Sequence, residues 1–198
     1  MERGKGMRCW ETGEGSSESV RPEAGYGMEA QRYLSIEEKI EEARALYEAW
    51  AERLRRDGRI RDLLERLEQN IHASMQAMRA LRVVQACKWC EEQEGGSCCG
   101  AGIENRYDPV QLLINLLLDV SLPDRRKYPD SCHFLETDGC CLKARHVLCV
   151  NYLCKKVQET LSKDELNTLQ AITGEELDTG FALHEAIRKE VGRKAGDR

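Results

Sequence analysis

Nine of the chain's ten cysteines fall between Cys87 and Cys154, and none occurs in residues 10–86. Cysteines that only fill a core are spread along a chain, whereas thiols gathered in one short segment share a chemical role. The two roles that cysteine-rich segments commonly serve are a disulfide framework and a metal site. The clustering therefore predicts that residues 87–158 form a small, irregular module organised by its thiols.

The spacing of the thiols favours a metal site over disulfides. Cys87 and Cys90 form a C-x2-C pair, whose two intervening residues allow both sulfurs to face one ion. Two adjacent pairs and three single thiols follow, at Cys98, Cys99, Cys132, Cys140, Cys141, Cys149 and Cys154. Adjacent cysteines point apart, so each pair is expected to supply one ligand to a site or to serve two sites. A module stapled by disulfides is the alternative for an oxidising compartment.

The N-terminus predicts a cytoplasmic protein, and the charge distribution limits its partners. The first residues contain no apolar stretch typical of a secretory signal, and the apolar residues 110–118 are too few to span a bilayer. Residues 87–154 contain seven Lys and Arg against ten Asp and Glu, a net charge of −3. Nucleic-acid-binding modules carry the opposite charge. We therefore expect neither a nucleic acid nor a membrane as a partner.

The residues before the cysteines have the pattern of two amphipathic helices. Ser35 and Glu38 form a capping box that starts the first helix. Two apolar series follow at helical spacing, one at Ile36, Ile40, Ala43, Tyr47, Trp50 and Leu54, the other at Ile60, Leu64, Leu67, Ile71, Ser74, Met78 and Leu81. Their phases differ across Asp57 and Gly58. This change predicts an antiparallel helical hairpin over residues 29–86, with Gly58 in the left-handed conformation at the turn.

The second helix is expected to run directly into Cys87. Further along, Asp108 and Pro109 predict the start of a buried helix. Ser162 and Glu165 form another capping box, and Gly174 is expected to break the helix that they start. Residues 159–198 should therefore contain more than one C-terminal helix. The predicted fold class is mainly α.

The lead of the chain, residues 1–28, is expected to be disordered. It is rich in glycine and charged residues and lacks apolar groups that could form a core. Cys9 lies in this lead and is expected to play no part in metal binding. Met1 and Met28 are alternative translation starts that would leave the folded part unchanged.

The cysteine segment resembles the bacterial YkgJ-like family of zinc- or iron-chelating domains, which has a CxxCxxCC core. Family members continue with C-P-F-L, an acidic-Gly-x-C element, R-P-x-x-C and a last cysteine after an aromatic residue. In this chain the corresponding elements are Cys132-His133-Phe134-Leu135, Asp138-Gly139 with Cys141, Arg145 to Cys149, and Tyr152 before Cys154. The resemblance covers residues 85–158, and His133 and His146 replace the two prolines.

The resemblance implies a ligand set of eight thiols: Cys87, Cys90, Cys98, Cys99, Cys132, Cys141, Cys149 and Cys154. Cys140 is an additional thiol that could take the place of Cys141. His133 and His146 stand where the family has a residue that cannot bind metal, so a hydrogen-bonding role is expected for both. Arg145 is expected to donate to a sulfur or a carboxylate beside the site.

Eight thiolates suit either two four-cysteine zinc sites or one iron–sulfur cluster, such as a 4Fe–4S cluster. We expect a cytosolic protein that chelates zinc or iron, with the helical hairpin as a surface for a protein partner. The alternative is an iron–sulfur-dependent enzyme, because the family's cysteine pattern also occurs in flagellin lysine methylases. The sequence shows no glycine-rich nucleotide loop and no nucleophile–base pair, so no catalytic residue is predicted.

Overall fold

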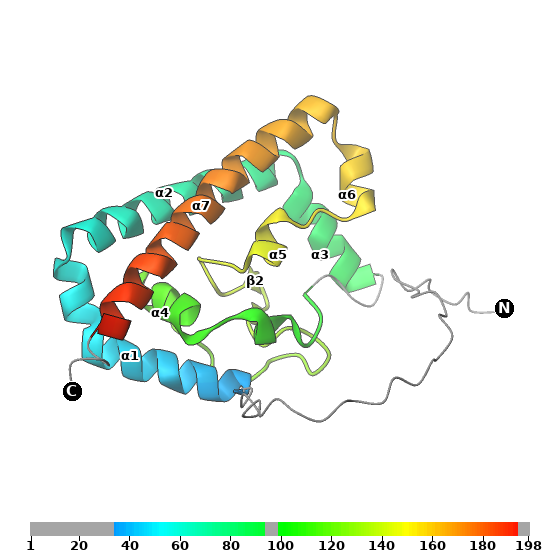
Figure 1. The fold of residues 1–198 in the computed structure, drawn as a ribbon. Helices are drawn as coiled ribbons and strands as arrows, with labels where there is room; N and C mark the ends of the chain where they lie inside the picture. Colours follow the sequence, from blue (N-terminus) through cyan, green and yellow to red (C-terminus); the bar gives the residue numbers. More distant parts are fainter. Residues whose placement is uncertain (1–33, 94–98, 194–198) are drawn as a thin grey trace, which may run out of the picture. The chain divides into compact units, whose positions relative to one another are not determined.

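The computed structural model describes residues 34–93 and 99–193, which belong to one compact, mainly helical unit (Figure 1). The helices are α1 (Ile36–Arg56), α2 (Gly58–Ala80), α3 (Val83–Gln93), α4 (Pro109–Leu117), α5 (Val147–Asn151), α6 (Lys155–Thr160) and α7 (Lys163–Arg193). A 3-10 turn, η1 (Ile103–Arg106), precedes α4, and strands β1 (Leu135–Glu136) and β2 (Gly139–Cys140) form an antiparallel hairpin. The predicted lead, with Cys9, lies outside the described residues, as does Cys98.

α1 begins where the sequence predicts. The Ser35 hydroxyl accepts a hydrogen bond from the backbone N–H of Glu38 at 3.2 Å, and the Glu38 carboxylate accepts one from the N–H of Ser35 at 2.8 Å. These reciprocal bonds satisfy two donors that a helix start otherwise leaves without partners. The predicted capping box is confirmed.

α1 and α2 are separate helices, as predicted, but Asp57 makes the break. Asp57 is extended (φ −69°, ψ 117°), and its carboxylate accepts a hydrogen bond from the N–H of Ile60 at 3.0 Å. Gly58 is the first residue of α2, and positive φ is found at Gly102 and Gly139 instead among the described glycines. The prediction of a left-handed Gly58 is wrong, because the N-cap aspartate turns the chain.

The two helices meet near the break and then diverge (Figure 1). α1 packs mainly against α4, and α2 packs mainly against α7. The shared core contains Leu54, Ile60, Leu64, Leu67, Ile71, Leu113, Ile114, Leu117, Leu118, Leu183, Ala186 and Ile187. The apolar faces of the predicted hairpin are therefore covered mostly by helices from later in the chain. α1 and α2 contact each other only to a limited extent and do not pack along their length as the predicted hairpin would.

α2 ends before the first thiols, contrary to the prediction that it runs directly into them. Leu81 caps the helix, and Arg82 is left-handed with φ 59°. α3 then starts at Val83 in a new direction and carries Cys87 and Cys90. The two cysteines still share one helical face, because residues three apart are neighbours on a helix.

α7 is a single helix of 31 residues, so the predicted break at Gly174 is wrong. Its start agrees with the prediction, since the N–H of Glu165 donates to the Ser162 hydroxyl at 3.2 Å. α7 contacts α2 extensively, and the buried Thr173 and Glu176 flank Gly174 on that side. Tertiary packing of this kind outweighs the low intrinsic helix propensity of one glycine.

We expect Gly174→Ala to raise the free energy of unfolding by about 0.5–1 kcal/mol, because alanine loses less backbone entropy in a helix interior. A Cβ atom at Gly174 would meet no other atom within 4 Å. Urea unfolding of the full chain measures the change. Gly102→Ala is the opposing control: φ there is 101°, so this variant should lose stability. A destabilised Gly174→Ala would mean that the helix is interrupted there.

α4 starts as predicted and is largely buried. The Asp108 carboxylate accepts a hydrogen bond from the N–H of Gln111 at 2.7 Å, and Pro109 occupies the first turn.

Within the described ranges, no helix is both long and apolar enough to cross a membrane.

Candidate functional site: a cluster of thiols

A backbone hydrogen bond joins the two halves of the cysteine segment. The N–H of Cys132 donates to the carbonyl of Cys99 at 2.6 Å, beside a strand-like bridge between Gly100 and Ser131. Cys132 is buried, with 7% of its surface exposed. The two segments therefore form one module, although 32 residues separate their nearest described thiols in the sequence.

Cys140 and Cys141 lie in different surroundings. Cys140 ends β2 opposite Leu135, and the N–H of Cys141 donates to the Phe134 carbonyl at 2.9 Å. Successive residues of an extended chain point to opposite faces. Cys140 lies within electrostatic reach of Cys141, Arg145 and Cys132. The pKa of Cys141 is instead raised to about 11 by burial and then by the charge of Glu136.

Cys149 and Cys154 come from the end of the module. Cys149 is the third residue of α5, and Cys154 is the N-cap of α6. Burial and the charge of Cys99 raise the pKa of Cys149, while a hydrogen bond from the Tyr107 side chain acts in the opposite direction. Burial also raises the pKa of Tyr107, so its phenol keeps the proton.

Seven thiols from different parts of the module act on one another and are called the thiol cluster below: Cys87, Cys90, Cys99, Cys132, Cys140, Cys149 and Cys154. Cys141, which is not counted in the cluster, acts on its sequence neighbour Cys140. Partial burial of the sulfur and then the charges of Cys154, Cys99 and Cys90 raise the pKa of Cys87. Burial, followed by the charges of Glu104, Cys99 and Cys149, raises the pKa of Cys132 to about 12. Each thiolate in such a cluster makes ionisation of its neighbours less favourable, unless a cation is present to offset the negative charge.

The thiol cluster does not form a closed metal site in this arrangement. The described residues include no group of three or more His, Cys, Asp or Glu side chains that could hold a metal ion. No disulfide joins the eight cysteines within the described ranges. The donor chemistry suits a thiophilic metal, but the sulfurs would have to move closer together to bind one.

The two histidines of the module make the hydrogen bonds expected of them. His133 is buried, and its Nε2 atom donates to the Pro123 carbonyl at 3.1 Å. His146 is the N-cap of α5, where its Nδ1 atom accepts from the N–H of Leu148 at 3.2 Å. Both side chains hold loops in place beside the thiols.

Arg145 brings positive charge to the thiol cluster. Its Nη2 atom donates to the sulfur of Met78 at 3.6 Å, and its charge acts on Cys87, Cys140 and Cys149. The hydrogen bond therefore goes to a neutral thioether and not to a thiol of the site, and Arg145 acts on the thiols through its charge alone. The charge opposes the mutual repulsion of neighbouring thiolates.

Asn115 supports the module in a way that the sequence did not reveal. It is fully buried in α4, where its Nδ2 atom donates to the Ala144 carbonyl at 2.9 Å and its Oδ1 atom accepts from the Ala144 N–H at 3.0 Å. These bonds fix the chain next to Arg145. In the sequence Asn115 only interrupts an apolar run, and a polar residue at a buried helix position was the available signal.

A second support is the ion pair between Glu104 and Arg126. Glu104 is 1% exposed, and its carboxylate also accepts a hydrogen bond from the N–H of Gly102 at 2.8 Å. Arg126 donates further to the Ser131 carbonyl, next to Cys132. Arg126 belongs to a charged run that suggests a solvated loop, so only its distant partner reveals its role.

His184 links α7 to the start of α4. Its Nε2 atom lies 2.7 Å from the carboxylate of Asp108. This bond raises the pKa of His184. Burial would raise the pKa of Asp108, but the hydrogen bonds from His184 and Gln111 outweigh it and lower that pKa. The pair fastens the helices that carry the module.

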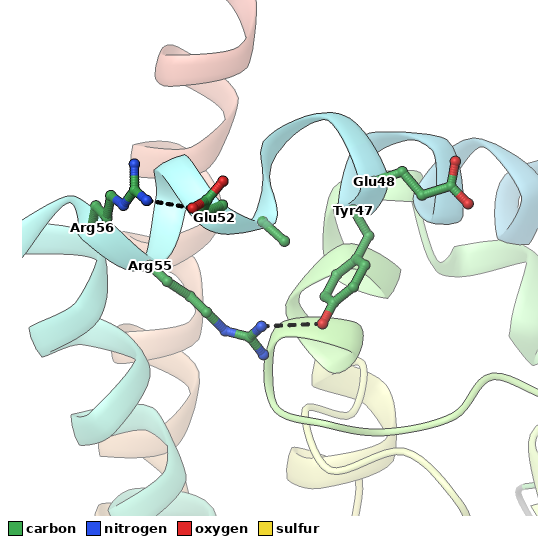
Figure 2. Close-up of a pocket in the computed structure, with 6 residues that line it drawn as sticks. Tyr47, Glu48, Glu52, Arg55 and Arg56 are labelled. Atoms are coloured by element: carbon green, nitrogen blue, oxygen red, sulfur yellow. Dashed lines mark hydrogen bonds and ion pairs between the residues drawn. The ribbon is translucent and has the colours of Figure 1, made fainter.

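A shallow pocket on α1 has no thiol or histidine in its lining (Figure 2). Tyr47, Glu48, Ala51, Glu52, Arg55 and Arg56 line it. Arg55 donates to the Tyr47 hydroxyl at 3.1 Å and to the Asp119 carboxylate at 2.9 Å. Arg56 pairs with Glu52. Glu52, Arg55 and Arg56 are thus engaged in ion pairs, and the eight described thiols lie elsewhere.

Comparisons with known proteins add no identification. No protein-family model matches the chain, no curated protein matches it, and no solved structure matches it.

Proposed function

We propose that the chain is a metal-binding protein whose thiol cluster chelates zinc or iron. The position of Cys99 carries the proposal. The carbonyl of Cys99 accepts a hydrogen bond from the backbone N–H of Cys132. The charge of the Cys99 thiolate raises the pKa values of Cys87, Cys132 and Cys149. Thiols from both ends of the module therefore share one neighbourhood, and a bound cation would relieve the repulsion between their thiolates.

The proposed ligands are the thiol cluster together with Cys98. Of the two adjacent cysteines, we favour Cys140 over Cys141 as the ligand, because the charges of Cys132 and Arg145 act on the Cys140 thiol. Raised thiol pKa values mean that metal binding must release protons, so affinity should rise with pH. A zinc ion would stabilise the fold, whereas an iron–sulfur cluster would supply electron transfer. The resemblance to YkgJ-like chelating domains also supports zinc or iron binding by these cysteines.

Anaerobic purification of the full chain, followed by elemental analysis and a visible spectrum, tests the proposal. We expect bound zinc or iron in a fixed ratio to protein, and absorption in the visible range if the metal is an iron–sulfur cluster. Apoprotein should also take up zinc or reconstitute a cluster from iron and sulfide. A chain that holds neither metal as purified or after reconstitution would contradict the proposal.

A further inference from the structure

We propose that Arg126 is a positioning residue of the thiol cluster, which aligns Cys99 with Cys132 so that both sulfurs can bind one metal ion. The role toward a metal rests on the function proposed above. The alignment itself exists in the chain without metal, so the two proposals can fail separately.

The backbone pairing places Cys99 and Cys132 directly opposite each other. Gly100 and Ser131 form an antiparallel bridge, and the N–H of Cys132 donates to the Cys99 carbonyl at 2.6 Å. The next residues outward, Cys99 and Cys132, are therefore partners too, with their side chains on the same face. The Cβ atoms of such partners lie about 4.5–5.5 Å apart, close enough for both sulfurs to bind one zinc ion.

Two backbone hydrogen bonds cross this bridge among the described residues. Besides the bond from Cys132, the N–H of Ala101 donates to the Asp130 carbonyl at 3.2 Å. Even a complete two-stranded hairpin is only marginally stable in water by itself. The alignment of Cys99 with Cys132 therefore depends on side chains that join the two segments.

Arg126 joins the two segments through two nitrogen atoms. Its Nη1 atom donates to the Ser131 carbonyl, and its Nη2 atom donates to the Glu104 carboxylate. The other Glu104 oxygen accepts a hydrogen bond from the N–H of Gly102 at 2.8 Å, so these bonds close a ring across the bridge. Glu104 is 1% exposed, and the Arg126 side chain is 27% exposed. Hydrogen bonds to charged groups are the strong ones, so the ring can hold the bridge closed.

The planar guanidinium allows Arg126 to make both bonds at once. Arginine presents its donors in a rigid fork, whereas lysine has a single nitrogen on a flexible stem. Arg126→Lys therefore keeps a positive charge beside the buried Glu104 but does not hold both acceptors in the same geometry. This variant separates positioning of the bridge from neutralisation of the carboxylate.

Hydrogen exchange of the metal-free chain, followed by NMR, tests the alignment directly. In Arg126→Lys the amides of Cys132 and Ala101 should exchange about tenfold faster, the effect of losing one hydrogen bond to a charged group. Arg53→Lys is the matched control, because Arg53 donates to Glu190 through one nitrogen in a pair that joins α1 to α7. It should leave both amides unchanged, because a short bridge opens locally. Unchanged exchange in Arg126→Lys would overturn the proposal.

A second variant keeps the test valid if Arg126→Lys folds poorly. Glu104→Gln/Arg126→Met removes the ring and leaves no buried charge without a partner. The amides of Cys132 and Ala101 should again exchange about tenfold faster. Wild-type exchange in this variant would show that the bridge holds without the ring, and would likewise reject the role of Arg126.

Cobalt(II) binding supplies the metal readout. Arg126→Lys should weaken cobalt binding about tenfold, at the lower end of the range for residues that orient metal ligands. It should also change the visible d–d bands of the bound ion, because these bands report the arrangement of the ligands. Arg53→Lys should keep the wild-type affinity and bands.

The two proposals fail in different ways. Wild-type affinity and bands in Arg126→Lys would reject the role of Arg126 toward the metal and keep the metal-binding function. A wild-type chain that binds no cobalt would reject the metal-binding function, and the exchange rates would still decide whether Arg126 aligns the two cysteines.

Discussion

Replacing Phe134 with alanine is expected to lower the free energy of unfolding by about 4 kcal/mol, the usual cost of a large cavity in a packed core. Phe134 is fully buried between α1 and the cysteine module. Its core contains Ile36, Ile40, Ala43, Tyr107, Leu112, Leu122, Cys132 and Leu142. The ring contacts Tyr107 at 5.2 Å and His133 at 5.4 Å, so its loss would loosen both neighbours.

Urea unfolding of the metal-free chain, followed by circular dichroism, measures this loss. Phe181→Ala is the matched control, because Phe181 is 69% exposed and should cost less than about 0.5 kcal/mol. A cost below about 1 kcal/mol at Phe134 would contradict the packing of the module on α1. The expected result implies that the module and α1 share an apolar core, which stabilises the fold without metal.

Replacing Cys99 with serine is expected to weaken zinc binding by more than about 100-fold, beyond the range of changes outside the ligand set. This expectation rests on the proposed metal-binding function. Serine is smaller and a poor ligand for a thiophilic metal. The unfolding free energy of the metal-free variant should change by less than about 1 kcal/mol, because Cys99 is only partly buried.

Cys141→Ser is the matched control for this experiment, because Cys132 and Arg145 act on Cys140, whereas Glu136 raises the pKa of Cys141. Competition with a chromophoric chelator gives the zinc affinity of each variant. Cys141→Ser should retain the wild-type affinity, whereas Cys140→Ser should reduce it. The opposite order would assign the ligand to Cys141, and an unaffected Cys99→Ser would remove Cys99 from the site.

The starts of α1, α4 and α7 could be predicted from the sequence because each depends on local contacts. Ser35, Asp108 and Ser162 each accept a hydrogen bond from the N–H three residues later. Such bonds require only the side chain and the adjacent turn. The break at Asp57 was visible for the same reason, since the phase of an apolar repeat is also a local property.

The gathering of thiols from both ends of the module was likewise apparent in the order of the cysteines. Their individual surroundings were not. Cys140 and Cys141 are neighbours in the sequence, and only the pairing of β1 with β2 places them on different sides. The supporting roles of Asn115 and Tyr107 depend on partners at Ala144 and His146, which lie far along the chain.

The sequence by itself determined the local features of this protein: the helix starts, the apolar faces and the segment that carries the thiols. Tertiary structure decided how those faces are covered and which side chains meet. Gly174 remains helical because α7 packs along α2, and α1 diverges from α2 because α4 fills the space between α1 and α7. The physical reason is that burial of apolar surface and long-range hydrogen bonds contribute more free energy than the propensity of any single residue.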